Sequence, residues 1–272
     1  MKVELIDYTE DGINKIATLA RSTRLNKFDD SEPEDYCDLI PLENGNYEMK
    51  VTDEYKEWEK KNENFIRSLI KVQHLGVLEH INFTFHVSEV SRCLTHQLVR
   101  HRIGFSYLQM SNRHAKPDMN DFVIPKHKNP DVEAVFKTNL YEAYNNYCHL
   151  IDELGVPIED ARYVLPPAFF THISFTVNAR SLRHFLELRL HKSAQWEIRE
   201  LACKIFDEVY KWYPILFEDL LPLRLQNSEL TVDFDITKSH KEGDITVVDE
   251  LDLKSISIKS EDLKELRDNA DV

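Results

Sequence analysis

Three arginines lie close together in one stretch of a strongly acidic chain. Residues 98–114 read LVRHRIGFSYLQMSNRH and contain Arg100, Arg102 and Arg113. Guanidinium groups that approach one another repel, unless an anion lies among them or solvent separates them. Their planar fork fits phosphate oxygens in a two-point contact. The stretch therefore predicts either a phosphate site or an ordinary solvated surface.

Other segments carry side chains that could complete a phosphate site. A dinucleotide pyrophosphate and a nucleotide monophosphate, held together, would require several arginines from distant parts of the chain. Taken singly, each such arginine is also typical of a surface or ion-paired residue. The candidates outside the first stretch are Arg162 in ARYVLPP, Asn178, Arg180 and Arg189 in NARSLRHFLELRL, and His74, Glu79 and His80 in HLGVLEH.

Several common kinds of site are not supported by the sequence. The six glycines form neither GxGxxG nor GxxxxGK[ST], so a Rossmann or P-loop turn is not expected. His96 and His101 are not spaced for adjacent helical turns, and we predict no metal site. No GxSxG elbow occurs, and Cys93 lies on an apolar stripe, so we expect it to pack in the core rather than react.

The composition indicates a globular protein with a substantial core. The chain has 272 residues, of which 42% are hydrophobic, enough for one large domain or two small ones. A net charge of −14 disfavours nucleic acid and anionic membranes as partners. The N-terminus has no apolar signal region, and no long apolar run occurs, so we expect a cytoplasmic protein. The scattered Cys37, Cys93, Cys148 and Cys203 are expected to be reduced thiols.

Hydrophobic periodicity predicts helices interrupted by two strands. The strands are INFTFHV, where apolar and polar residues alternate, and FTHISFTV. The acidic, aperiodic segment 28–52 is predicted to be a surface loop, and the charged segment 227–272 a separate extension beyond a 1–226 catalytic domain. The predicted helices span 11–22, 53 to Gly76, about 90–101 with RHR at its end, 131–154 closed by Gly155, a short helix with Pro157 at N1, about 180–190, and 194–212.

The order of these motifs resembles that of the flavin-dependent thymidylate synthases, from about Phe65 to Tyr213. The matching segments, in family order, are LEHINFTF, SRCLTHQLVRHR, SYLQMSNR, DARYVLP and NARSLRHFLELRLHKSAQWEIRELA. The resemblance implies a mixed α/β fold with a central sheet flanked by long helices. It also implies a homotetramer in which FAD lies between subunits and dUMP stacks against the flavin ring.

Matching motif positions imply roles for individual residues. The resemblance suggests Ser111, Arg189 and His74 as catalytic, with Ser111 orienting the uracil rather than attacking it. The family pattern has seven residues between RHR and the motif serine, whereas IGFSYLQM has eight, which implies one extra residue around Gly104–Phe105. The implied dUMP set is Gln97, Arg100, Gln109, Ser111, Arg113, Arg162 and Arg189. The implied FAD set is His74, Glu79, Arg100, His101, Arg102, Ile103, Asn178, Arg180 and His184.

The implied reaction is the reductive methylation of dUMP to dTMP. Methylenetetrahydrofolate would supply the carbon, and FAD reduced by NADPH would supply the hydride. The protein would orient dUMP and stabilise the charge that develops on its carbonyl oxygens. Two alternatives stay open: a related FAD-dependent transfer such as hydroxymethylation without reduction, and a degenerate flavin- or nucleotide-binding protein without activity.

Overall fold

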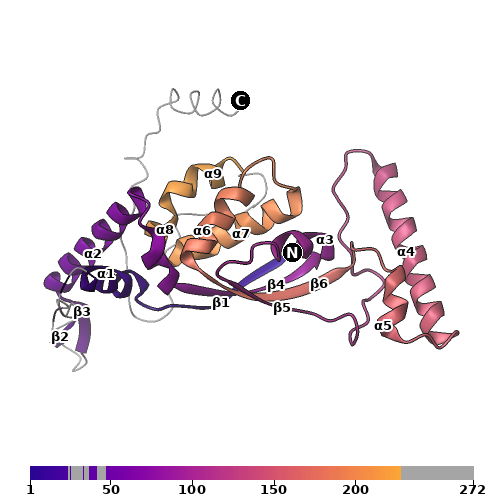
Figure 1. Ribbon diagram of the computed structural model, residues 1–272, viewed down its shortest axis with the longest axis horizontal. Coiled ribbons are helices and arrows are strands. Elements are labelled where there is room, and N and C mark those ends of the chain that lie inside the picture. Colours follow the sequence, from indigo (N-terminus) through magenta and orange to yellow (C-terminus); the bar gives the residue numbers. More distant parts are fainter. Residues whose placement is uncertain (24, 26–32, 34–36, 42–46, 228–272) are drawn as a thin grey trace. The chain divides into compact units, whose positions relative to one another are not determined.

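A four-stranded antiparallel sheet forms the centre of the fold (Figure 1). The computed structural model describes residues 1–23, 25, 33, 37–41 and 47–227. The strands lie in the order β1 (Lys2–Tyr8), β4 (Asn82–Ser91), β6 (Phe170–Asn178) and β5 (Phe105–Gln109). The mixed α/β class expected from the sequence is confirmed, as are the strands at INFTFHV and FTHISFTV.

The two faces of the sheet differ in polarity. On one face Phe85 of β4 pairs with Phe175 of β6, and both side chains are buried. On the other face the Oγ1 atoms of Thr84 and Thr176 lie 3.0 Å apart in a hydrogen bond. Alternation along each strand thus directs one set of side chains to the core and leaves the other half-buried.

Three helices cover the apolar face. They are α3 (Arg92–Leu98), α6 (Ala179–Arg189) and α7 (Trp196–Trp212), and Figure 1 shows α6 and α7 lying along the sheet. Both long helices bury an apolar stripe of the kind that packs on a sheet. The buried stripe comprises Leu182, Phe185 and Leu186 on α6, and Ile198, Leu201, Ile205 and Val209 on α7.

The N-terminal part adds a helical pair and a short connection. Helix α1 spans Gly12–Ser22, and α2 spans Asp53–Lys71, starting at Thr52, whose Oγ1 accepts from the Tyr55 amide at 3.2 Å. The helix that was expected to continue to Gly76 ends earlier, because Gln73 takes a left-handed conformation with φ 60°. Gly76 lies instead in the 3₁₀ helix η1 (Leu75–His80).

A long helix and two short ones follow the strand β5. Helix α4 spans Pro130–Asp152, α5 spans Ile158–Ala161, and the 3₁₀ helix η2 spans Arg162–Val164. Pro157 caps α5 rather than occupying its first turn. Of the apolar stripe expected on α4, only Leu140 and Tyr147 are buried, whereas Val135 is 61% exposed and Phe136 is 40% exposed.

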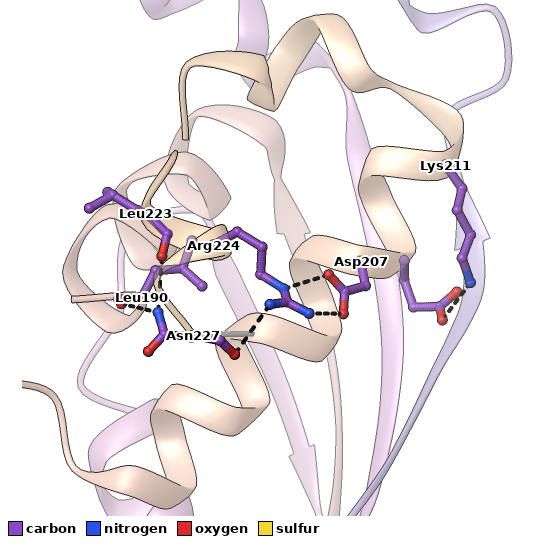
Figure 2. A network of polar contacts seen from close by, with 7 residues as sticks. Leu190, Asp207, Lys211, Leu223, Arg224 and Asn227 are labelled. Atoms are coloured by element: carbon purple, nitrogen blue, oxygen red, sulfur yellow. Dashed lines mark hydrogen bonds and ion pairs between the residues drawn. The ribbon is translucent and has the colours of Figure 1, made fainter. Parts of the chain in front are cut away.

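The last described elements are α8 (Pro214–Phe217), the 3₁₀ helix η3 (Glu218–Leu220) and α9 (Leu221–Leu225). Arg224 of α9 forms a two-point ion pair with Asp207 of α7, at 2.6 and 2.7 Å, as Figure 2 shows. Asn227 is fully buried and bonds to the carbonyl of Leu190. The expected extension therefore begins with a residue of the core, while 228–272 lie outside the described residues.

Other expectations from the sequence also need correction. The segment 28–52 is not simply a loop, because β2 (Cys37–Pro41) and β3 (Tyr47–Val51) pair as an antiparallel hairpin. The edge strands β1 and β5 were not expected, since neither shows a long apolar alternation. Cys93 is exposed rather than in the core. Helix α3 begins at Arg92, after a strand that includes Val90, so the buried face of α3 carries Leu94 and Leu98 instead.

Within the described ranges no helix is long and apolar enough to cross a membrane. The same ranges contain no group of three or more His, Cys, Asp or Glu side chains placed to hold a metal ion.

Candidate active site

One group of the candidate side chains gathers where β6 passes into α6. Asn178 ends the strand, and its Oδ1 accepts from the Ser181 amide at 2.9 Å, which caps the helix. The next amide, of Ala179, donates to the carbonyl of Ile81 at 2.8 Å. Nη1 of Arg180, the second residue of α6, lies 2.6 Å from Glu79 Oε1 of η1. Glu79, Asn178 and Arg180 are thus held together.

The arginine segment 100–103 joins this group through Gly104. The Gly104 carbonyl accepts from the Asn178 amide at 3.2 Å. Gly104 has φ +71°, and a Cβ atom there would lie 2.3 Å from Ser181 Oγ, so only glycine fits. The extra residue expected around Gly104–Phe105 stays a prediction, and this turn is the place where it would lie. The loop is therefore fixed against the start of α6.

His101 and Arg189 meet in the same region. Arg189 Nε donates to His101 Nε2 at 3.1 Å, so the imidazole proton lies on Nδ1. Burial, together with the charges of Arg189 and His184, lowers the pKa of His101 from 6.5 to about 4. His101 is therefore a neutral acceptor at neutral pH, and it fixes the direction of the Arg189 guanidinium.

We call the residues His74, Glu79, Arg100–Ile103, Asn178, Arg180, His184 and Arg189 the α6 cluster. Arg100 and Arg102 are exposed, and within the described ranges neither is paired with a carboxylate. The only bond of the Arg100 side chain there is a long one, 3.4 Å, to the carbonyl of His96 at the end of α3. Ile103 is 87% exposed, and His74 is also exposed before η1.

A second group forms around Glu159 of α5. Its Oε2 accepts from Arg113 Nε at 3.1 Å and from Arg113 Nη2 at 3.0 Å. Its carbonyl accepts from Arg162 Nε at 2.8 Å. Two of the four arginines of the implied dUMP set, Arg113 and Arg162, are thereby brought to one acidic residue, although they are far apart in the sequence. We call Arg92, Gln109, Ser111–Arg113, Glu159 and Arg162 the Glu159 cluster.

Ser111 lies at the exposed turn after β5. Its Oγ accepts from the Arg113 amide at 3.3 Å, so this contact leaves the hydroxyl proton available for donation. Within the described ranges, no histidine or carboxylate bonds to the hydroxyl, as activation of a nucleophilic serine requires. The neighbouring Gln109 is fixed, because its Nε2 donates to Thr95 at 3.0 Å and to Thr171 at 3.2 Å.

Reasoning from the sequence did not identify Glu159, Arg92 or Asn112. Arg92 Nη2 donates to the Met110 carbonyl at 3.0 Å and to Asn112 Oδ1 at 2.5 Å, which holds the turn before Arg113. Burial, followed by the charge of Arg162, lowers the pKa of Arg92. Local spacing gave no signal for Glu159, because its carboxylate contacts the distant Arg113, whereas Arg162 bonds to its backbone carbonyl.

The two clusters lie at opposite ends of one strand. Gly104, just before β5, belongs with the α6 cluster, and Gln109, its last residue, with the Glu159 cluster. Four steps along a strand cover roughly 13 Å. A single chain thus divides the implied dUMP set between both ends, with the half-buried Gln97 on α3 between them.

The chain is similar in sequence to known proteins along most of its length. Residues 4–215 match the family model described as thymidylate synthase complementing protein. The chain is 40% identical to the flavin-dependent thymidylate synthase of Saccharolobus solfataricus over 252 residues, covering 89% of this chain and 87% of the relative. It is 39% identical to that of Sulfurisphaera tokodaii over 224 residues, covering 82% and 78%.

A solved structure is also similar to this fold. It is the crystal structure of flavin-dependent thymidylate synthase ThyX from Helicobacter pylori, complexed with FAD and dUMP. The TM-score is 0.59 at 25% sequence identity, covering 81% of this chain and 99% of that one.

The fold and the family match define an enzyme of nucleotide metabolism. The chain belongs to the family of flavin-dependent thymidylate synthases.

Proposed function

We propose that the protein converts dUMP to dTMP by reductive methylation, with methylenetetrahydrofolate as carbon donor and NADPH as reductant of a bound FAD. The observation that carries this proposal is the gathering of arginines in both clusters, of which Arg100, Arg102 and Arg162 have no carboxylate partner in the described part of the chain. The likeness to a structure complexed with FAD and dUMP supports it. When bound, FAD supplies hydride chemistry that no side chain of the protein can provide.

The donors of the α6 cluster fit the phosphates of FAD. Arg100 and Arg102 are exposed and lack carboxylate partners in the described part of the chain, so their guanidiniums can receive a pyrophosphate. No glycine-rich phosphate loop is needed, because the donors are guanidinium groups. Asn178, Arg180 and His184 follow on one short helical segment and would hold the rest of the cofactor.

The Glu159 cluster fits the nucleotide. Arg113 and Arg162 lie beside one another at Glu159, and a phosphate can replace the single carboxylate as the partner of Arg113. Ser111, with its hydroxyl proton available, would donate to a uracil oxygen and orient the ring. Arg189, directed by His101, would stabilise negative charge on the pyrimidine as the new carbon bond forms.

The position of the clusters supports a homotetramer. One dUMP would have to meet both Arg113 and Arg189, which lie at opposite ends of β5 in one chain. In an oligomer, the Glu159 cluster of one copy could lie beside the α6 cluster of a neighbouring copy, and one dUMP could then contact both arginines. The exposed apolar residues Val135 and Phe136 of α4, which form a hollow with Val132 and Asn139, provide a surface for such contacts.

Product analysis tests the proposed reaction. The purified protein is incubated with dUMP, methylenetetrahydrofolate and NADPH. The nucleotides are then separated and identified by mass spectrometry. We expect dTMP, and a protein that carries the absorption of oxidised flavin. Hydroxymethyl-dUMP as the stable product would instead establish the transfer without reduction. A protein that forms no product and cannot be loaded with FAD would contradict the proposal.

A further inference from the structure

The end of α6 is held by a residue from the far end of the described chain. Helix α6 ends at Arg189, and Leu190 follows as its cap. Leu190 is 1% exposed, so water cannot satisfy its carbonyl. The carbonyl accepts instead from Asn227 Nδ2 at 2.8 Å (Figure 2). No glycine ends this helix, and Asn227 provides the cap that the local sequence lacks.

The Asn227 amide is suited to this position by its two donor hydrogens. The second one donates to the carbonyl of Leu223 at 3.0 Å. Two carbonyl acceptors around one nitrogen require an NH₂ group, and neither a carboxylate nor a hydroxyl can provide both bonds. The residue is fully buried, so its orientation is fixed by these two contacts.

Asn227 is itself anchored to α7. The backbone N–H of Asn227 donates to the carbonyl of Arg224 at 3.0 Å, and Arg224 Nη1 donates to the backbone carbonyl of Asn227 at 3.4 Å. The guanidinium of Arg224 is held by both oxygens of Asp207, as Figure 2 shows. Asn227 is therefore held in place on α7 through Arg224 and Asp207 while its side chain contacts Leu190.

We propose that Asn227 is a positioning residue for the active site, which acts on Arg189 through the carbonyl of Leu190. Arg189 is adjacent to the capped residue, and its Nε must reach His101 Nε2 on the segment after α3. If the end of α6 unwinds, the backbone of Arg189 shifts, and its guanidinium no longer points to His101. The inference rests on the proposed function in so far as Arg189 is taken to contact dUMP.

The test compares full-length Asn227→Ala with two control variants at residues close to Asn227 in the sequence. Gln226→Ala removes an exposed amide side chain next to it. Leu223→Ala weakens the local packing but keeps the carbonyl that accepts from Asn227. We expect dUMP to bind about tenfold more weakly to Asn227→Ala, as for one lost hydrogen bond, and near wild-type strength to both controls. Equal weakening in Leu223→Ala would overturn the proposal.

A double-mutant cycle with Arg189→Ala separates positioning from general loss of stability. If Asn227 acts through Arg189, replacing Asn227 in the Arg189→Ala protein should weaken dUMP binding no further. Additive losses would mean that Asn227 acts by another route. Asn227→Asp should resemble Asn227→Ala, because a carboxylate cannot donate to either carbonyl.

A second measurement does not depend on the reaction. NMR titration of His101 should show a higher pKa in Asn227→Ala than in wild type, since the Arg189 charge moves away from the ring. An unchanged His101 titration would show that Arg189 stays in place and would refute the positioning role. If the wild-type protein does not bind dUMP at all, the proposed function fails, while this titration still decides the role of Asn227.

Discussion

At the scale of single residues, the chain pairs some of its arginines and leaves others without an acidic partner. Arg113 rests on Glu159 and Arg180 on Glu79, whereas Arg100 and Arg102 have no carboxylate partner among the described residues. If Arg113 and Arg180 bind phosphates as proposed, each would exchange a carboxylate for a phosphate when its ligand binds. Exposed ion pairs of this kind contribute roughly 0–1 kcal/mol, so the exchange costs little.

Replacing Arg113 should weaken the nucleotide and leave the flavin in place. A charge-assisted hydrogen bond contributes roughly 1.5–3 kcal/mol, so Arg113→Ala should bind dUMP about ten- to a hundredfold more weakly. Arg113→Lys should recover little, because a single ammonium cannot reproduce a forked contact. Isothermal titration with dUMP gives the affinities, and flavin absorption gives the FAD content. Lys116→Ala, an exposed charge nearby, is the control, and equal weakening in it would argue against a specific contact.

Ser111 distinguishes an orienting hydroxyl from a nucleophile. Its Oγ accepts from the Arg113 amide and has no base beside it in the described ranges, so Ser111→Ala should bind dUMP less tightly yet still form dTMP. Turnover is measured at saturating dUMP. Complete loss of turnover with dUMP binding intact would restore the serine as an obligatory nucleophile.

His101 should make the stability of the ligand-free protein depend on pH. Its folded pKa of about 4 lies below the ordinary value of 6.5, so the unfolded chain takes up a proton first as the pH falls. The contribution to stability is complete above pH 6.5 and is lost as the pH falls from there towards 4. Urea unfolding at pH 7.5 and pH 5 should show that the free energy of unfolding falls less between these pH values for His101→Gln than for wild type. His96→Gln, an exposed histidine on α3, should lose as much as wild type.

At the scale of elements, η1 and the start of α6 form one surface through Arg180 and Glu79. Arg180→Ala should lose FAD while the fold remains, because the broken ion pair is exposed and worth little for stability. Circular dichroism checks the fold, and flavin absorption after reconstitution checks binding. Arg67→Ala, which breaks another exposed pair with Glu218, should keep its flavin. Wild-type FAD affinity in Arg180→Ala would show that this arginine does not contact the cofactor.

The sequence allowed the two inner strands and most helices to be predicted, because their apolar residues recur at regular intervals. The outer strand β5 was missed, since FSYLQ is short and leaves Leu108 77% exposed. The α6 cluster could be assembled only through the family resemblance. Glu159 was missed because its role depends on a contact with Arg113, forty-six positions away, and such proximity has no signal in local spacing.

At the scale of the whole molecule, the proposed dUMP residues are divided between the two ends of a strand, so the proposed site predicts that copies of the chain assemble. Sedimentation should give about four times 32.1 kDa, with FAD lost on dilution to the monomer. Phe136→Asp on α4 should weaken the assembly if that apolar surface is covered by another copy. Lys137→Ala, an exposed neighbour on the same helix, should sediment as wild type does. A stable wild-type monomer that binds FAD would contradict the shared site.

The order of strands in the sheet also affects how the chain folds as it is synthesised. Strand β6 lies between β4 and β5, although it follows both in the sequence. Until residues 170–178 leave the ribosome, β5 has no partner in the sheet, and Gly104 has no Asn178 amide to accept from. Pairing at such long separation in sequence is slow. The arginine segment that would bind the flavin therefore becomes ordered late, and a nascent chain that stalls before β6 exposes both β4 and β5 as unpaired edges.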